Sequence, residues 1–169
     1  MSKEPVSIGV LIASYRRPAI LLSCLRSLTR QIRLPDDVIV VVREDDAETN
    51  AMLAEANTLL APPLTVVRVT TPGTVAARNA GLGACRTDVL CILDDDTEPQ
   101  PQWLEVVLRR FVEDPALGGL GGRDRCFDGK AFDERQEAVV GRIQWYGRMI
   151  GNHHLGFGGI REVDFLKGA

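Results

Sequence analysis

Three consecutive aspartates, Asp94, Asp95 and Asp96, directly follow the apolar run Val89–Leu93. A run of this kind, rich in leucine and β-branched residues, is typical of a buried parallel strand. Like charges this close together repel one another, and a divalent cation would neutralise them. Mg²⁺ and Mn²⁺ prefer carboxylate oxygens and commonly share their site with substrate phosphates. Because ligands of open α/β sheets bind outside the carboxyl ends of the strands, the run predicts a metal-assisted phosphate site.

A simpler interpretation of these acids is a solvated turn in which Asp94 or Asp96 caps a following helix. Pro99 and Pro101 do indicate a helix start nearby. Three acids exceed what one cap requires, so we favour metal or nucleotide binding.

A second acidic group, Glu44, Asp45 and Asp46, follows the apolar run Val38–Val42. At the end of a neighbouring strand, such a carboxylate can accept hydrogen bonds from a base N–H group or from ribose hydroxyls. The alternative is a helix N-cap at Asp46, with acids favoured by the helix dipole in the first turn. The sequence leaves both interpretations open.

Two further clusters carry weaker signals. Pro72 and Gly73 open a small-residue helix in which Arg78 is placed to hold a phosphate in a forked geometry; the alternative is a packing helix with an exposed arginine. Near the C-terminus, His153 and His154 follow an aromatic pair, Trp145 and Tyr146. One histidine is a candidate ligand for a sugar, a phosphate or a metal, whereas the aromatic rings are expected to pack.

The elements that must position these residues alternate between strand and helix patterns, which predicts right-handed βαβ units and a mostly parallel sheet. A fifth strand over Leu117–Gly122 is a weaker prediction because of its four glycines. Residues 124–160 show no clear period and suggest loops and a helix. The predicted strands are Val6–Ala13, Val38–Val42, Leu64–Val69 and Val89–Leu93, and the predicted helices follow Pro18 and span Asp46–Leu60, Thr74–Cys85 and Gln102–Val112.

Composition limits the function classes. The 169 residues are enough for one domain, and a net charge of −3 argues against a general nucleic-acid binder. The four cysteines, Cys24, Cys85, Cys91 and Cys126, lack metal-site spacing, and we interpret them as reduced and structural. With no secretory leader and no long apolar run, we expect a cytoplasmic protein without a membrane span, whose attachment to a membrane, if any, depends on segments outside this chain.

Taken in order, the motifs resemble the family 2 glycosyltransferases, inverting enzymes of the GT-A fold that use nucleotide-diphosphate sugars. The resemblance lies in Val10–Pro18, in Gly73–Gly81 and in Ile92–Pro99 followed by Trp103 and Leu104. It implies an α/β, Rossmann-like fold with a mostly parallel central sheet and helices on both faces. It also implies a nucleotide-diphosphate sugar as donor and a hydroxyl group of a glycan, a lipid or another molecule as acceptor.

The resemblance assigns roles residue by residue. Asp94 matches the first acid of the family's DxD motif, near the ribose and diphosphate, and Asp95 occupies the variable middle position. Asp96 matches the second acid, which holds Mg²⁺ or Mn²⁺ against the diphosphate. The loop of Ala13, Ser14 and Tyr15 is implied to contact base and ribose, Arg78 to lie near the diphosphate, and Asp45, favoured over Glu44, to contact the base.

Two departures from the family pattern stand out. The acidic pair after the second strand reads Arg43–Asp46 here, so the base-contacting acid is ambiguous. The family's catalytic carboxylate normally lies beyond the point where this chain ends at Ala169, and Asp133, Glu134 and Glu137 come too early for that role. We therefore expect a nucleotide-sugar-binding core over residues 1–123, the start of an acceptor-side region over 124–169, and a base beyond Ala169.

Other classes fit less well. A phosphatase with an aspartate nucleophile needs Asp-x-Asp-x-Thr, but Glu98 stands two residues after Asp96 and Thr97 comes one place early. A receiver-like signalling domain needs its acidic pair after the first strand, where this chain has Ser14–Arg17. The remaining alternative is a nucleotide-sugar-binding or regulatory module without transfer activity.

Overall fold

The computed structural model describes residues 5–56 and 64–167. They form a first unit that runs to Ala116 and a second unit that starts at Leu117. In chain order the elements are β1 (Ile8–Ala13), α1 (Pro18–Leu28), β2 (Asp37–Arg43), α2 (Ala47–Ala56), β3 (Leu64–Val69), α3 (Thr74–Ala84), β4 (Val89–Asp94), α4 (Trp103–Glu113), β5 (Arg142–Ile143), β6 (Met149–Ile150) and the 3₁₀ turn η1 (His153–Leu155).

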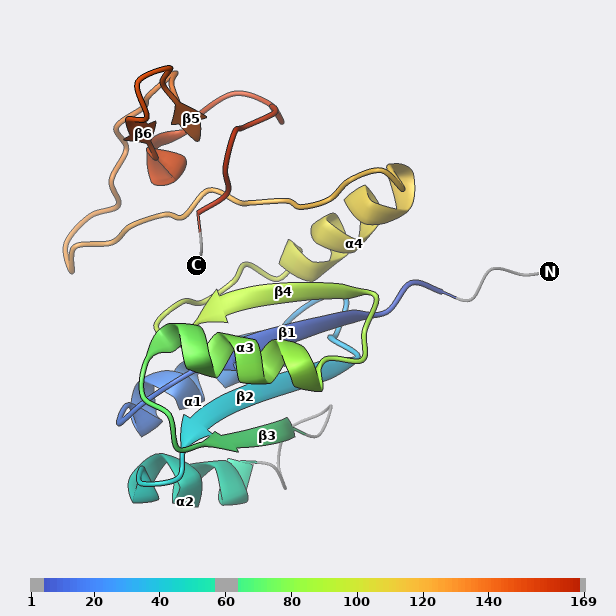
Figure 1. The fold of residues 1–169 in the computed structure, drawn as a ribbon, viewed down its shortest axis with the longest axis vertical. Helices are drawn as coiled ribbons and strands as arrows, with labels where there is room; N and C mark the ends of the chain where they lie inside the picture. The colour runs from blue at the N-terminus through green and yellow to red at the C-terminus, as the bar shows by residue number, and fades with distance from the viewer. Residues whose placement is uncertain (1–4, 57–63, 168–169) are drawn as a thin grey trace. The chain divides into compact units, whose positions relative to one another are not determined.

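The first unit is built on a parallel four-stranded sheet with the order β3-β2-β1-β4 (Figure 1). Strands β1 and β2 lie at its centre, and their interior residues are buried on both faces, as continuous apolar runs require. In the register of the sheet, Ala13 pairs with Val41 on one side and with Asp94 on the other. The carboxyl ends of β1, β2 and β4 therefore finish at one edge, as predicted.

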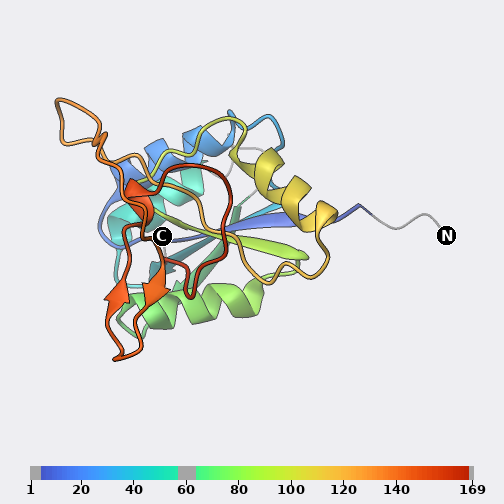
Figure 2. The same ribbon diagram turned by 90° about the horizontal axis from the view of Figure 1, so that it is seen from above.

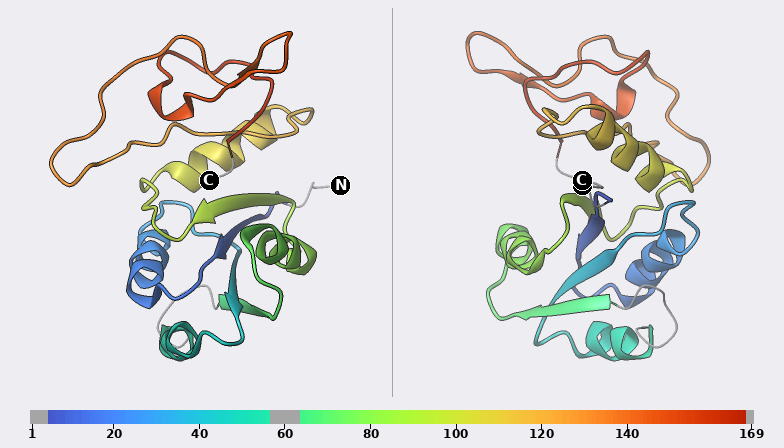
Figure 3. Two further views of the ribbon diagram at one scale, coloured as in Figure 1. Left: turned by 60° about the vertical axis from the view of Figure 1, so that its left-hand side comes forward. Right: turned by 90° about the vertical axis from the view of Figure 1, so that its right-hand side faces the viewer.

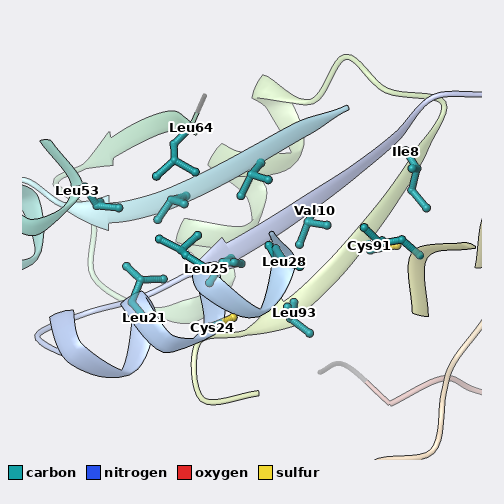
Figure 4. Packing of buried hydrophobic residues seen from close by; sticks show 14 of the residues in the cluster. Ile8, Val10, Leu21, Cys24, Leu25, Leu28, Leu53, Leu64, Cys91 and Leu93 are labelled. Atoms are coloured by element: carbon teal, nitrogen blue, oxygen red, sulfur yellow. The ribbon is translucent and has the colours of Figure 1, made fainter. Parts of the chain in front are cut away.

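Helices cover both faces of this sheet. Alternate strand residues such as Val10 and Val40 pack in one large cluster with side chains of α1, α2 and α4 (Figure 4). The intervening residues, such as Leu11 and Val41, pack in a smaller cluster with Ala77 and Ala84 of α3. Figures 2 and 3 show α1 and α3 on opposite sides of the sheet. The predicted fold class, a mostly parallel sheet with helices on both faces, is confirmed.

The helix α1 begins and packs as its sequence predicts. Pro18 occupies its first turn, where the missing N–H would have no intrahelical partner. Its buried face is formed by residues at helical spacing, Leu21, Cys24, Leu25 and Leu28, which point at the sheet in Figure 4. The residue before the helix, Arg17, thereby comes to lie beside the edge where the strands end.

The helix α3 approaches the sheet at a position that only glycine permits. A Cβ atom on Gly81 would clash with Cδ1 of Leu11 and would lie 2.9 Å from Cγ2 of Val41. Alanine-sized residues on the rest of this helix face keep the same short distance. The close packing fixes α3, and with it Arg78, relative to β1 and β2.

The second unit has little regular structure. Strands β5 and β6 pair as a short antiparallel hairpin, and η1 follows them. The predicted fifth strand over Leu117–Gly122 is wrong, because these residues form no strand. Four glycines in six residues raise the entropic cost of an extended strand and supply no side chains to pack.

Most predicted boundaries agree with the observed ones to within two residues. The helix predicted over Asp46–Leu60 is observed as Ala47–Ala56, with Asp46 just before it, and the predicted residues 57–60 lie outside the described part of the chain. Within residues 5–56 and 64–167, none of the helices combines the length and apolar character needed to cross a bilayer.

Candidate functional site

The carboxyl ends of β1, β2 and β4 bring together three segments that are far apart in sequence. The amide of Ser14, just after β1, donates to the carbonyl of Val41 in β2 at 3.0 Å. The hydroxyl of the same serine donates to Oδ2 of Asp95, just after β4, at 2.6 Å. Ser14 and Asp95 are 7 % and 6 % exposed, so this bond is shielded from water. The loop after β1 is thus held against both neighbouring strands.

The three aspartates at the carboxyl end of β4 lie in three different environments. Asp95 is buried and accepts from Ser14 and from Nη1 of Arg17, the latter at 2.8 Å. Asp94 accepts from Nη2 of Arg78 at 2.8 Å, and its side chain is 47 % exposed. Asp96 is the most exposed, at 55 %, and has a longer contact of 3.3 Å with Nη1 of Arg17. Of the three, Asp96 is the most accessible to a ligand.

Arg17 and Arg78 offset much of the charge of this cluster. The bond to Asp95, with the nearby charges of Asp95 and Asp96, raises the pKa of the Arg17 guanidinium above its ordinary value. Arg78 comes from α3 and reaches Asp94 across the edge of the sheet. The helix that was predicted from Pro72–Gly81 therefore does place its arginine at the acidic strand end.

The members of the second acidic group also differ in their burial and in their partners. Asp46, 3 % exposed, accepts from the amide of Thr49 at 3.2 Å and thus caps α2, and it also accepts from the amide of Arg16. Burial disfavours its charged form, but these N–H groups outweigh burial and lower the pKa of Asp46. Asp45 is exposed and pairs with Nη2 of Arg43 at 2.8 Å. The N-cap interpretation is confirmed for Asp46, which also braces the loop after β1.

Glu44 lines a cavity that Asp45 does not reach. The cavity has a volume of about 320 Å³ and lies between the ends of β2 and β3 and the helix α3. Besides Glu44, its lining residues are Arg68, Val69, Thr70, Thr71, Ala76 and Ala80. It is large enough for a planar base and offers a carboxylate, a guanidinium and two hydroxyls to bind one.

The loop after β1 is strained and carries an aromatic ring. Arg16 has a φ of +56°, a conformation that costs about 1–3 kcal/mol for a residue other than glycine. The ring of Tyr15 lies 5.0 Å from the guanidinium of Arg16 and 5.1 Å from that of Arg43, measured to the ring centroid. A half-exposed aromatic face beside two cations is a suitable stacking surface for a base.

The residues at this edge fit a divalent cation that is shared with a phosphate ligand. In the described chain no three His, Cys, Asp or Glu side chains are grouped to enclose a metal. Mg²⁺ does not require such a cage, since it commonly uses one or two carboxylates together with substrate phosphates and water. The half-exposed carboxylates of Asp96 and Asp94 supply oxygen ligands of this kind.

The cysteines near the site are packing residues, as predicted. Cys24 and Cys91 are buried, and all four cysteines are free thiols. Burial, reinforced by the neighbouring carboxylates of Asp95 and Glu98, raises the pKa of the Cys24 thiol to about 12. Burial alone does the same for Cys91. Neither thiol is ionised at neutral pH, so neither is a nucleophile.

The clusters predicted near the C-terminus belong to the second unit. His153 stacks edge-on against Phe165, and its Nε2 lies 3.2 Å from the carbonyl oxygen of Phe165. Trp145 and Tyr146 contact each other at the turn of the β5–β6 hairpin, where Trp145 is 96 % exposed. The expectation that these aromatic rings pack does not hold for Trp145, whose ring contacts Tyr146 but is otherwise largely exposed.

Arg17 is the contact that sequence reasoning missed. The available signal was a basic residue next to the predicted nucleotide-binding loop, directly before the proline that starts α1. Nothing in the local sequence identifies its partner, because Asp95 lies 78 residues away along the chain.

Comparisons with known proteins identify the family of this chain. Residues 9–164 match the family model described as glycosyl transferase family 2. An uncharacterised glycosyltransferase of Haemophilus influenzae is 30 % identical over 120 residues, covering 70 % of this chain and 39 % of that protein. The hyaluronan synthase of Pasteurella multocida is 29 % identical over 123 residues, covering 71 % of this chain and 12 % of the synthase. The chain thus spans less than half the length of these relatives.

Solved structures show the same fold. Staphylococcus aureus TarS 1–349 in complex with UDP-GlcNAc matches with a TM-score of 0.54 at 19 % identity, covering 73 % of this chain and 38 % of that one. Glucosyl-3-phosphoglycerate synthase from Mycobacterium tuberculosis, in complex with Mn²⁺, UDP and phosphoglyceric acid, matches with a TM-score of 0.51 at 20 % identity, covering 70 % and 41 %. By its sequence the chain belongs to glycosyl transferase family 2, and its first unit has the GT-A fold.

Proposed function

We propose that this chain holds the donor site of a metal-dependent, inverting glycosyltransferase that transfers a sugar of the hexosyl type from a nucleotide diphosphate to a hydroxyl group. The observation that carries the proposal is the pair of bonds Ser14–Asp95 and Arg78–Asp94. They join the three segments that were assigned separately to the donor. Solved relatives bound to UDP-GlcNAc or to UDP and Mn²⁺ support a nucleotide-sugar ligand.

Each site residue has a defined part in this proposal. Asp96, with its exposed carboxylate, is the metal ligand, and a bound Mg²⁺ or Mn²⁺ would stabilise the charge on the leaving diphosphate. Asp94 and Arg78 orient the ribose and diphosphate region. The loop Ala13–Tyr15 holds base and ribose, with the ring of Tyr15 as a stacking surface. Asp95 acts from behind this site, because its carboxylate is buried between Ser14 and Arg17.

Two carboxylates are candidates for the contact with the nucleotide base. Asp45 remains the predicted contact, although its pair with Arg43 must open to free it. Glu44 is added because it lines the cavity between β3 and α3. UDP, GDP and dTDP are titrated against Glu44→Gln and against Asp45→Asn. The residue that contacts the base is the one whose substitution abolishes the difference in affinity between these nucleotides.

In the proposed reaction the acceptor hydroxyl attacks the anomeric carbon in line with the leaving diphosphate, and a carboxylate base takes its proton. We assign that base to no residue of this chain, which spans less than half the length of the Haemophilus influenzae and Pasteurella multocida relatives. Transfer activity is therefore tested on a version that extends past Ala169. A version that binds donor but transfers nothing would support the second candidate, a nucleotide-sugar-binding module.

Calorimetric titration of UDP, GDP and dTDP, with and without Mn²⁺, tests the donor site itself. We expect one nucleotide to bind, and Mn²⁺ to strengthen its binding. In Asp96→Ala the factor by which Mn²⁺ increases the nucleotide affinity should fall at least about tenfold. This is the lower end of the range of losses seen when a metal site is disturbed. Glu98→Ala is the matched control, because Glu98 lies two residues further on and bonds Ser23 and Arg30 instead. Binding that ignores both the metal and Asp96→Ala would refute the proposal.

A further inference from the structure

Arg17 is bound to two of the three strand-end carboxylates at once. Its Nη1 lies 2.8 Å from Oδ1 of Asp95 and 3.3 Å from Oδ2 of Asp96. We infer that Arg17 is a positioning residue that acts as a built-in counter-charge: it fixes Asp95 and weakens the binding of a free divalent cation at Asp96, so that the cation binds together with the nucleotide rather than alone. This inference rests on the proposed function, because it concerns the cation that the donor site would use.

The backbone of Arg17 is held where this role requires it. Arg17 is the N-cap residue of α1, and its carbonyl accepts from the amide of Leu21 at 3.0 Å. Pro18 restricts the backbone of the residue before it. On its other side, Arg16 is held in a left-handed conformation by the bond from its amide to Asp46. The guanidinium therefore projects from a fixed point on the loop.

The two contacts of Arg17 differ in strength. Asp95 is buried and held in place by the hydroxyl of Ser14, so its short bond to Arg17 is shielded from water. Asp96 is 55 % exposed and Arg17 is 48 % exposed, and a pair of this kind contributes little in water. Arg17 can thus stay on Asp95 while Asp96 takes another partner.

The net charge at the carboxyl end of β4 decides how strongly a free cation is attracted. Asp94, Asp95 and Asp96 carry three negative charges, and Arg17 and Arg78 offset two of them. The charge left to attract a cation is therefore small. A nucleotide diphosphate adds negative charge and oxygen ligands at the same place, which restores the attraction. Binding of the cation and binding of the nucleotide become linked, and by linkage each strengthens the other by the same factor.

The first test measures the binding of Mn²⁺ alone, by the loss of the free-ion signal in electron paramagnetic resonance. We expect Arg17→Gln to bind Mn²⁺ more tightly than the unchanged chain, by up to about fivefold, because the substitution removes a positive charge beside the carboxylate of Asp96. Arg17→Lys, which keeps the charge, should stay within about twofold. The control Arg30→Gln removes an exposed arginine that pairs with Glu98, and it should change nothing. Weaker Mn²⁺ binding in Arg17→Gln, or equal gains in Arg17→Gln and Arg30→Gln, would overturn the inference.

The second test needs neither metal nor nucleotide. A double-mutant cycle of Arg17→Gln and Asp95→Asn, measured by chemical unfolding, should show effects that are not additive, whereas Arg17→Gln and Asp96→Asn should be nearly additive. Additive effects for Arg17 and Asp95 would show that Arg17 does not fix Asp95. If the cycle succeeds but no nucleotide binds with Mn²⁺, the proposed function has failed while the position of Arg17 stands. If nucleotide and Mn²⁺ bind but the cycle fails, the inference alone has failed.

Discussion

Different interactions stabilise the interior of each of the two units of this chain. The first unit has strands of six or seven residues and a core in which many side chains are fully buried. In the second unit, the buried hydrophobic side chains among the described residues are Val140 and Leu155, and the strands have two residues each. Ion pairs such as Arg142–Asp164 and Lys167–Asp124 connect its segments instead. Burial of apolar surface depends little on pH, whereas exposed ion pairs depend on pH and are screened by salt.

The largest effect is expected from removing the same side chain in each unit. Leu25 of α1 is 1 % exposed, and Leu25→Ala should lower the free energy of unfolding by about 2–5 kcal/mol. Leu155 is 7 % exposed in a sparser cluster, and Leu155→Ala should cost less than about 2 kcal/mol, because its surroundings can collapse. Denaturant titration measures both costs. Amide hydrogen exchange should rise only in the second unit of Leu155→Ala, and equal costs in the two variants would contradict the comparison.

A smaller effect tests whether close packing limits the first unit. Gly81→Ala places a methyl group against Leu11 and Val41, and we expect a loss of about 1–3 kcal/mol in the free energy of unfolding. Gly83 lies in the same helix with no atom within 4 Å of the added Cβ, so Gly83→Ala should raise stability by up to about 1 kcal/mol. Thermal unfolding of the two variants separates these outcomes. A gain in both would mean that α3 moves freely on the sheet.

The smallest effect concerns pH and the second unit. The hydrogen bond and ion pair from Arg135 lower the pKa of Asp133 from 3.8 to about 2, and bonds from Ile143 and Arg142 lower the pKa of Asp164. A carboxyl group whose pKa is lowered by folding stabilises the folded state at pH values above its ordinary pKa. This contribution is lost as the pH falls from about 4 to about 2. Asp36, Asp46 and Asp88 of the first unit also have lowered pKa values, so both units lose stability over this range. The second unit has only two buried hydrophobic side chains among its described residues, so it should open first in hydrogen exchange measured at pH 6, 4 and 3. Simultaneous opening of both units would contradict this order.

Sequence patterns predicted the first unit well because its local and long-range preferences agree. Val10, Ile12 and their neighbours are apolar at every position, which fits a central parallel strand and little else. The motifs at Ser14, Arg78 and Asp94 could be singled out because each lies in, or directly after, an element with a clear sequence pattern. Their partners were not predicted, since the Ser14–Asp95 bond depends on β1 and β4 being neighbours in the sheet. Over Leu117–Gly122 an apolar pattern was present without the backbone preference that a strand needs.

The left-handed backbone of Arg16 has a consequence for how this protein can change. The bond to Asp46 uses the amide of residue 16 and not its side chain, so another residue can make it. Asparagine adopts this conformation more readily than arginine does, and glycine more readily still. A substitution at position 16 can therefore relieve the backbone strain and keep the hydrogen bond from its amide to Asp46. What such a replacement gives up is the cation beside Tyr15, whose ring is the proposed stacking surface for a base.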